Sequence, residues 1–336
     1  MPSKQKAHYK KTKLPRVVAI GGGHGTAVVL EGLRDYPVDV SAIVSMADDG
    51  GSSGILRREL GVLALGDVRR ALVALAGDEC RLLADIAEYR FTKGALAGHA
   101  LGNLMLVALE RMTGSFSKGL HAAHELFGVR GHVIPVTLES AELCAEYADG
   151  SVVRGEKNID MPKRAIVPAI RRVWLEPNAS PNPEALVAIR SADVIIFGPG
   201  DLYTSIVPNI LVRGVAEAIK KSSAKKIMIV NYRTKRSETN GFSATDFVRE
   251  LERYLGEGVL DVALCAITRV SPDRLAEMLR EGGEPVSYAD RGVSRAQLII
   301  RSLLTTRGIL RHDPKKLARA IMALLPAKQK NGNRRA

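Results

Sequence analysis

Three glycine-rich segments carry the residue types that bind phosphate groups. They are Gly21 to Thr26 (GGGHGT), Asp48 to Gly54 (DDGGSSG) and Gly198 to Ser205 (GPGDLYTS), and each directly follows a short apolar run. Phosphate oxygens need backbone N–H donors at close range, glycine allows that approach, and a helix N-terminus adds a favourable dipole. The sequence therefore predicts a cleft that binds a phosphorylated ligand.

The first segment differs from the loops of the common nucleotide-binding folds. It has the G-x-G spacing, but Thr26 stands where the dinucleotide fingerprint has its third glycine, and the lysine of a P-loop is absent. This difference argues against a nicotinamide cofactor and for a nucleotide-sugar. The alternative is a turn that only needs positive φ angles. His24 either contacts phosphate or marks the start of the helix.

The second segment places two adjacent carboxylates, Asp48 and Asp49, in a polar loop. Such a pair can hold a Mg²⁺ ion that bridges phosphates, or can accept hydrogen bonds from sugar hydroxyls. The alternative is a solvated loop that caps a helix. Arg57 and Arg58 follow, and either neutralise phosphate or belong to the ordinary surface. Mg²⁺ is the one cofactor that the sequence suggests.

A fourth segment, Gly98 to Leu104, opens a predicted helix with His99 and Asn103 four residues apart and therefore on one face. The pair either faces the cleft or is structural. The sequence contains no Ser-His-Asp order, no H-E-x-x-H motif and no clustered set of metal ligands. Nothing in it identifies a nucleophile, so catalytic residues stay unassigned.

These segments need a scaffold that brings the ends of several strands together. Residues 16–20 and 38–45 are apolar and β-branched, and residues 27–34 between them have helical spacing. The opening is therefore a predicted βαβ unit with parallel strands. A parallel sheet of this kind binds ligands at its carboxyl edge, which is where the first two glycine-rich segments lie.

The rest of the chain predicts an extended α/β fold. Residues 67–128 have helical patterns, which predicts a helical insertion, and the runs 143–147 and 151–154 predict a hairpin. Four later apolar runs are expected to extend the parallel sheet, at 173–175, 194–197, 226–230 and 262–267. They alternate with helical segments at 183–190, 210–220 and 244–254, and a last helix is predicted over 314–325. The predicted fold class is α/β, a Rossmann-like three-layer α/β/α architecture with a mainly parallel sheet and a helical insertion.

The charge of the chain lies mostly at its two ends. The 336 residues carry a formal charge of +13, of which residues 1–16 contribute six cationic side chains and residues 327–336 contribute four. We therefore predict basic disordered tails at 1–15 and 327–336 around one α/β domain at 16–326. Nucleic acid is an expected partner only through these tails, because the remaining +3 does not make a basic groove.

Three cysteines, Cys80, Cys144 and Cys265, are widely spaced and include no C-x-x-C pair. Neither a disulfide framework nor a zinc site is expected, and the thiols should be reduced core residues. The sequence shows no apolar secretion signal at its start and no apolar run long enough to span a membrane. The expected location is the cytoplasm.

Taken together, the glycine-rich segments resemble those of the YvcK/CofD-like family. The resemblance extends over nearly all of residues 16–326. It also includes GHALGN at 98–103, VVRGE at 152–156, VWLEP at 173–177 and LRHD at 310–313. The triple glycine of the first segment and the RHD sequence near the C-terminus place the chain in the YvcK branch, the gluconeogenesis factors.

This resemblance implies a regulatory protein that binds UDP-N-acetylglucosamine and is required for cell shape and for growth on gluconeogenic carbon sources. It implies partner proteins of cell-shape or cell-wall processes and is compatible with a homodimer. Arg311 becomes a candidate for the nucleotide-sugar site. The full set of expected ligand-binding residues is Gly22, Gly23, His24, Thr26, Asp48, Asp49, Ser52, Ser53, Asn103, Gly200, Tyr203, Thr204 and Arg311.

Two other functions stay open. The CofD branch joins a phospholactyl group to a deazaflavin alcohol, so an enzyme resembling 2-phospho-L-lactate transferase is one alternative. Such chemistry depends on positioning and Mg²⁺ more than on a nucleophilic side chain. The other alternative is a nucleic-acid-associated protein that acts through the basic tails.

The chain departs from the family pattern in three places. Residues 66–70 read GDVRR where the family has GDIRN, so Arg70 replaces an amide. Asp201 replaces the serine of GPGSLYTS and brings a negative charge to a predicted anion site. Residues 233–239 read RTKRSET where the family has MTQPGET, and Lys235 and Arg236 could supply compensating charge.

Overall fold

The computed structural model describes residues 14–164, 166–267, 271–288, 295–306 and 308–325. The predicted basic tails lie outside these residues, apart from Leu14 and Pro15. Within the described part of the chain, no helix has the length and apolar character that crossing a membrane requires. The three cysteines are unpaired; Cys144 and Cys265 are buried and Cys80 is half-buried.

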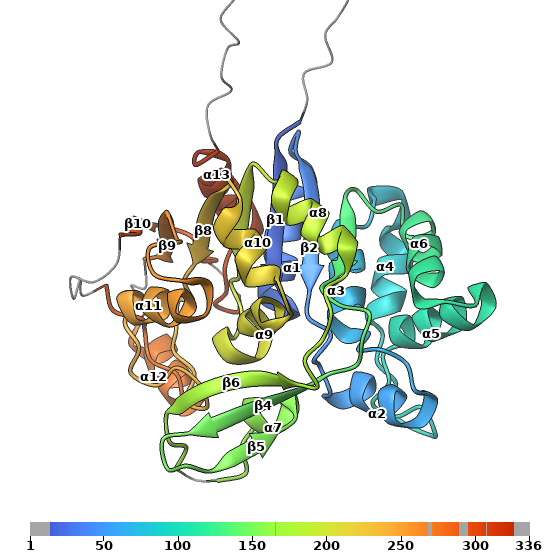
Figure 1. Ribbon diagram of the computed structural model, residues 1–336, viewed down its shortest axis with the longest axis horizontal. Coiled ribbons are helices and arrows are strands. Elements are labelled where there is room, and N and C mark those ends of the chain that lie inside the picture. Colours follow the sequence, from blue (N-terminus) through green and yellow to red (C-terminus); the bar gives the residue numbers. More distant parts are fainter. Residues whose placement is uncertain (1–13, 165, 268–270, 289–294, 307, 326–336) are drawn as a thin grey trace, which may run out of the picture.

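A seven-stranded parallel sheet forms the centre of the molecule (Figure 1). Its strand order is β10-β9-β8-β7-β1-β2-β3, and every neighbouring pair is parallel. The strands are β1 Arg16–Gly21, β2 Asp39–Val44, β3 His132–Pro135, β7 Val194–Phe197, β8 Lys225–Ile229, β9 Val262–Ala266 and β10 Gln297–Arg301. Short, continuously apolar strands such as β7 and β9 are typical of a sheet that is covered on both faces.

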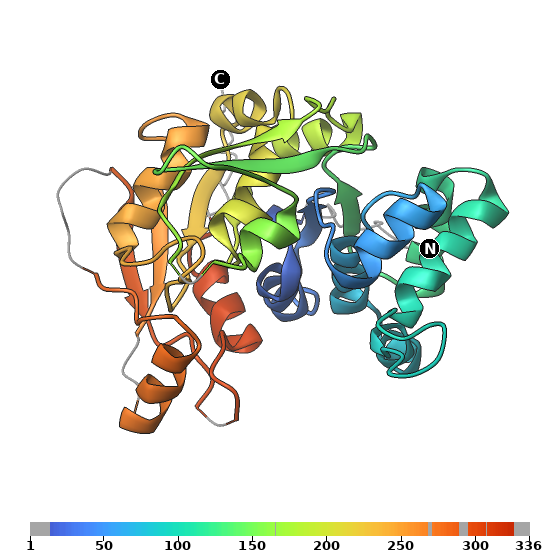
Figure 2. The ribbon, with the colours of Figure 1, turned by 90° about the horizontal axis from the view of Figure 1, so that it is seen from below.

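Helices cover the two faces of this sheet, and β1 shows how. Val17 and Ala19 pack into the core on one face, while Val18 and Ile20 pack into the core on the other. The first core includes α1 Gly23–Leu33, α3 Gly66–Leu75 and α13 Pro314–Met322; the second includes α8 Pro183–Ser191, α10 Val215–Lys221 and α11 Ala244–Leu255. Figure 2 shows α1 and α13 side by side on their face. The predicted three-layer α/β/α fold is therefore confirmed.

Helices fill the interval in which a helical insertion was predicted. After α3 come a 3₁₀ turn, Asp78–Cys80, and the helices α4 Arg81–Glu88, α5 Leu101–Thr113 and α6 Phe116–Leu126, which lie at one side of the molecule (Figure 1). A further helix, α2 Gly51–Leu60, was not predicted, because its first residues, GSSG, have low helix propensity.

A second, smaller sheet overturns one prediction. It contains β4 Glu142–Tyr147, β5 Val152–Arg154 and β6 Ile170–Glu176 in the order β5-β4-β6, all antiparallel, with the short helix α7 Glu156–Asp160 after β5. The predicted β4–β5 hairpin is present. Residues 173–175 were expected in the parallel sheet but belong to β6. Arg171, Arg172 and Glu176 are exposed, and the buried Val173 and Leu175 flank the half-buried Trp174, as in a strand with one side turned to solvent.

The segment after β7 also differs from the prediction. Residues 210–220 were expected to form one helix, but the chain forms a π-helical turn, Leu202–Ile206, then α9 Val207–Leu211, and then α10. Gly214 ends the irregular stretch between α9 and α10 with φ 78°, a left-handed conformation that interrupts a helix. Two elements near the C-terminus, α12 Pro272–Arg280 and β10, were not predicted.

Candidate functional site

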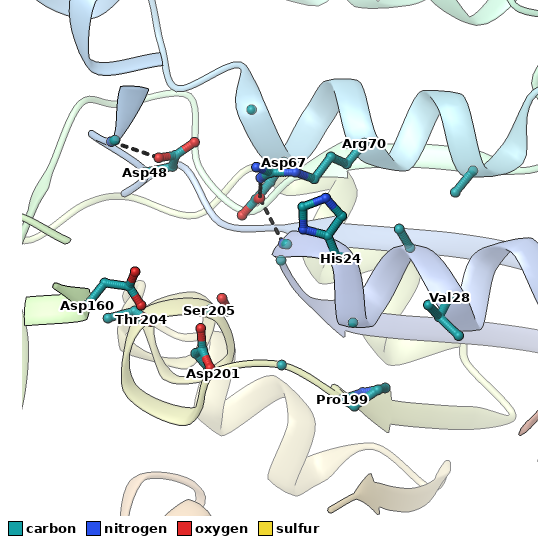
Figure 3. Close-up of a pocket in the computed structure, with 18 of the residues that line it drawn as sticks. His24, Val28, Asp48, Asp67, Arg70, Asp160, Pro199, Asp201, Thr204 and Ser205 are labelled. Carbon is teal, nitrogen blue, oxygen red and sulfur yellow. Dashed lines mark hydrogen bonds and ion pairs between the residues drawn. The ribbon is translucent and has the colours of Figure 1, made fainter. Parts of the chain in front are cut away.

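A cavity of about 840 Å³ lies at the carboxyl edge of the parallel sheet. The glycine-rich segments after β1, β2 and β7 all contribute to its walls, as Figure 3 shows for residues of each. The second, smaller sheet closes one side of this edge, because α7 supplies Glu156 and Asp160 to the lining. Segments nearly 180 residues apart therefore meet where the topology of a parallel sheet places ligands.

The first and third glycine-rich segments touch each other. A Cβ atom on Gly25 would lie 2.2 Å from the carbonyl oxygen of Pro199, so this contact requires glycine. Gly23 has φ 65°, which also favours glycine. Its amide donates a 2.8 Å hydrogen bond to Oδ1 of Asp67 from α3. The backbone of the first segment thus closely borders two other segments of the cavity.

Four helices begin at this cavity. The lining includes first-turn residues of α1, α2, α3 and α5, and none of the four N-cap residues makes a side-chain capping hydrogen bond. Two first amides are already bonded within the protein: Gly23 of α1 donates to Asp67, and Leu101 of α5 donates to the carbonyl oxygen of Tyr89. Backbone N–H groups at a helix N-terminus attract anions through unsatisfied hydrogen bonds and the helix dipole. The convergence of four such termini therefore favours a ligand with several anionic oxygens.

The two carboxylates of the second segment do not face the same space. Asp48 lines the cavity and accepts a 2.9 Å hydrogen bond from the amide of Gly50. Asp49 points to α7, where it accepts a 2.8 Å hydrogen bond from the amide of Lys157. The predicted Mg²⁺ pair is thus divided between a cavity wall and a helix cap. Arg57 donates to the carbonyl oxygen of Asp48 at 3.1 Å and so supports this loop.

One side of the cavity is acidic. Asp160, Asp201 and Glu238 offer carboxylate oxygens within 4.8 Å of one another. The ammonium of Lys235 contacts all three: it lies 2.7 Å from Asp201 and 3.5 Å from Glu238, and forms a short ion pair with Asp160. Two departures from the family pattern, at positions 201 and 235, therefore neutralise each other.

The pKa values on this side follow from burial and like charge. Burial and the carboxylate of Asp201 raise the pKa of Glu238 to about 7. Burial alone would lower the pKa of Lys235, but Glu238, Asp201 and Asp160 hold it above its usual value. Burial, followed by repulsion from Asp48, raises the pKa of Glu156 to about 9. This carboxyl group is therefore protonated near neutral pH.

The opposite side of the cavity is cationic. It is formed by α1, α3 and α4 together with the segment before α13, and it carries Arg34, Arg69, Arg70, Arg81, Arg90 and Arg311. Arg70 forms a 3.0 Å ion pair with Asp67, and the two lie beside His24 (Figure 3). Burial and the charge of Arg70 lower the pKa of His24. Burial and Asp48 raise the pKa of Asp67 to about 6, against the opposing effect of Arg70.

Most of the residues predicted from the sequence lie in the cavity wall. They are Gly22, Gly23, His24, Asp48, Ser52, Ser53, Asn103, Gly200, Thr204 and Arg311. Thr204 donates a 2.8 Å hydrogen bond to Glu238, and Ser52 is 3.2 Å from the buried His99. The structure gathers these residues from five separate parts of the chain, and their ligand contacts stay predictions.

Three predicted residues lie outside the wall. Asp49 caps α7, Thr26 is buried, and Tyr203 is 1% exposed. The pKa of Tyr203 is raised by burial and by Glu250, which places its hydroxyl near α11. The structure thus assigns these three side chains to the framework of the cavity.

Sequence reasoning missed several residues of the site. Asp67 and Arg69 could have been found from the glycine and aspartate that open α3, since this pattern resembles the first two segments. Glu156 lies in the VVRGE motif but was given no role, and Asp160 gave no signal, because the position of α7 depends on a small sheet whose third strand was misplaced. His312 also lines the cavity, and its ring packs edge-to-face on Tyr232 with 5.6 Å between centroids.

The fold is that of an α/β protein with a cavity at the carboxyl edge of a parallel sheet. The family model described as 2-phospho-L-lactate transferase CofD matches residues 17–303, and the chain belongs to this CofD family. This membership confirms the resemblance seen in the sequence.

Two curated relatives are similar over almost their whole length. The chain is 41% identical to the gluconeogenesis factor of Halalkalibacterium halodurans, over 92% of this chain and 96% of that protein. It is 40% identical to the gluconeogenesis factor of Bacillus subtilis, over 93% and 98% of the two chains. A crystal structure of a UPF0052 family member from Bacillus halodurans matches with a TM-score of 0.86 and 40% identity, over 93% of this chain and 99% of that one.

Proposed function

We propose that this protein binds UDP-N-acetylglucosamine as a regulatory ligand and is required for cell shape and for growth on gluconeogenic carbon sources. Its similarity to proteins named gluconeogenesis factor supports the metabolic role. The observation that carries the binding proposal is the convergence of four helix N-termini on one cavity. A diphosphate needs many donors at close range, and these termini supply them.

The dimensions and lining of the cavity fit the rest of such a ligand. A volume of about 840 Å³ lies in the upper part of the usual range for small-molecule sites, about 300 to 1,000 Å³. Tyr232, His312 and Arg311 offer ring faces and a guanidinium to a uracil base. The acidic side offers Asp160 and Asp201 to sugar hydroxyls. Cytoplasmic location, shape-determining partners and a homodimer belong to the same proposal.

Calorimetry on the full chain tests ligand binding. UDP-N-acetylglucosamine, UDP and GDP are titrated with and without Mg²⁺, and the proposal expects the uridine ligands to bind more tightly than GDP. The proposal would be contradicted if neither UDP-N-acetylglucosamine nor UDP binds.

Two glycine variants make this test specific. Gly23 and Gly61 have nearly the same φ, 65° and 66°, but Gly23 lies in the cavity wall and Gly61 follows α2 away from it. Alanine strains both positions by about 1 to 2 kcal/mol. Gly23→Ala should weaken UDP-N-acetylglucosamine binding at least about tenfold, and Gly61→Ala should leave affinity unchanged. Equal affinities in the two variants would remove the first segment from the site.

A phosphoryl-linked transferase is the second candidate, and the family model favours it. The cavity contains two carboxyl groups with raised pKa values, Asp67 and Glu156, and such groups are often catalytic. Incubation with a phospholactyl-nucleotide donor and a deazaflavin acceptor, followed by chromatography, should then give a joined product. The product should be lost in Asp48→Asn, whose side chain lines the cavity, and kept in Glu59→Gln on the exposed side of α2. Binding of UDP-N-acetylglucosamine without any product would instead support the regulatory role.

A further inference from the structure

Arg69 is a buried cation whose hydrogen bonds are incomplete. Its side chain is 3% exposed and lines the cavity, yet Nε and Nη1 have no hydrogen-bond partner. The nearest acid is Glu88, with 3.7 Å between Nε and Oε1, which is beyond hydrogen-bond distance. Burial lowers the pKa of Arg69, but an arginine stays charged in proteins.

The position of Arg69 is fixed by close packing. An ideal Cβ on Gly102 would lie 2.9 Å from Cδ of Arg69 and 2.8 Å from the carbonyl oxygen of Ala87, so α5 crosses tightly over this side chain. The guanidinium therefore cannot turn to solvent to complete its hydrogen bonds. A buried donor without a partner costs about 1 to 3 kcal/mol, and more when it is charged. A ligand that supplies oxygen atoms would remove this cost.

Two side chains near Arg69 also have buried polar atoms without a hydrogen-bond partner. Arg70 also lines the cavity, and its Nε is buried without a partner although Nη1 binds Asp67. On α5, Oδ1 of Asn103 is also buried without a partner, but this oxygen is an acceptor and needs a donor such as a hydroxyl group, so it does not add to the demand for an anion. The N-termini of α3 and α5 border this corner, because Arg69 is the fourth residue of α3 and Asn103 lies in the first turn of α5. Glu88 and Asp67 are the acids in contact with the two arginines.

We propose that Arg69 and Arg70 form an anion subsite on the α3 side of the cavity that binds a phosphate group. The subsite extends the proposed function, because it names the residues that meet one phosphate of the phosphorylated ligand. Planar guanidinium groups match the oxygen spacing of phosphate and carboxylate. The group belongs either to the nucleotide itself or to a second phosphorylated molecule.

Inorganic phosphate is the probe for this subsite. Calorimetry and thermal unfolding are measured with phosphate, acetate and chloride at equal ionic strength, on the wild-type chain and on Arg69→Met, Arg70→Gln and Arg190→Met. Arg190 is an exposed arginine on α8 and serves as the matched control. Phosphate should bind the wild type and the Arg190 variant equally, and bind the Arg69 and Arg70 variants at least about tenfold more weakly. Arg70 is more exposed than Arg69, so Arg70→Gln should fold even if Arg69→Met does not. The phosphate affinity of Arg70→Gln then tests the subsite.

Saturating UDP separates the two sources of the phosphate group. Phosphate that binds beside UDP indicates a second molecule, whereas phosphate that UDP displaces indicates the nucleotide. Undiminished phosphate binding in both arginine variants overturns the subsite, and so does a wild type that responds to phosphate no more than to chloride. If the wild-type chain binds phosphate through Arg69 but does not bind UDP-N-acetylglucosamine, the proposed function is overturned and the subsite is not. Preference for acetate over phosphate would contradict the phosphate assignment.

Discussion

At the scale of single residues, Lys235 decides the charge of the acidic side of the cavity. It is a positive charge among three carboxylates, and its partner Asp201 is itself a departure from the family pattern. The sequence suggested that Lys235 could compensate for Asp201. It could not indicate Asp160, which comes from α7, a helix whose position depends on the small antiparallel sheet.

We expect Lys235→Gln to destabilise the protein by about 1 to 2 kcal/mol, since removing one partner of a half-buried ion pair leaves like charges together. Restoring a serine, in Asp201→Ser with Lys235→Gln, should recover part of this loss. Urea unfolding of the wild type, both single variants and the double variant gives the coupling free energy. Strictly additive effects would show that the two positions are independent.

The raised pKa of Glu156 predicts that the free energy of unfolding depends on pH. Its pKa is about 9 in the folded protein and about 4.3 when unfolded, so the folded state holds a proton that the unfolded state has released. The stability from this group is fully present below about pH 4 and is lost as pH rises through 9. Between pH 6 and 9 the unfolding free energy of the wild type should therefore fall at least about 1 kcal/mol more than that of Glu156→Gln. Urea unfolding across this range measures the difference, and parallel curves would show that Glu156 ionises normally. Glu59→Gln is the control.

At the scale of elements, α7 depends on a residue that the sequence assigned to a metal. The carboxylate of Asp49 accepts a hydrogen bond from the amide of Lys157 in the first turn of α7. Asp49→Ala should therefore cost about 1 kcal/mol of stability, as for the loss of a helix cap. Its effect on ligand affinity should be smaller than that of Asp48→Ala, whose side chain faces the cavity. Thermal unfolding measures the loss of stability, and calorimetry compares the ligand affinities of the two variants. A larger loss of affinity in Asp49→Ala than in Asp48→Ala would show that Asp49 belongs to the ligand site.

Elements with a continuous apolar pattern were predictable, and those shaped by tertiary contacts were not. The strands at 16–20 and 194–197 were recognised because both of their faces are buried. The start of α2 was read as a loop, because GSSG has low helix propensity and one of its contacts is distant in the sequence, between Ser52 and His99. The strand at 173–175 was assigned to the wrong sheet, because three residues are too few to show that its other face meets solvent.

At the scale of the whole molecule, the sequence predicted that loops after different strands would meet, since parallel strands end at one edge. It could not predict the division of the cavity into an acidic and a cationic side. That division arises from Asp160 and Asp201 on one side and from Arg69 and Arg311 on the other. Asp160 and Arg311 reach the cavity through the positions of α7 and of the segment before α13, which depend on tertiary packing.

The contact between α1 and α13 couples the two ends of the described chain. A Cβ on Gly32 would lie 2.2 Å from the carbonyl oxygen of Pro314, so Gly32→Ala should push α13 away. We expect a loss of about 1 to 3 kcal/mol in stability. Affinity for UDP-N-acetylglucosamine should also fall, because Arg311 and His312 directly precede α13. The control is Gly61→Ala, since no atom lies within 4 Å of a Cβ at Gly61. Unchanged affinity in a folded Gly32→Ala protein would show that the C-terminal segment does not contribute to binding.

This packing has a consequence for the protein during its synthesis. The first wall of the cavity is translated near residue 22, but Arg311, His312 and the helix that holds them against α1 come about three hundred residues later. A ribosome-bound or prematurely ended chain without these residues therefore lacks one wall of the cavity. Ligand binding would then distinguish finished molecules from fragments, and only complete chains would respond to the ligand.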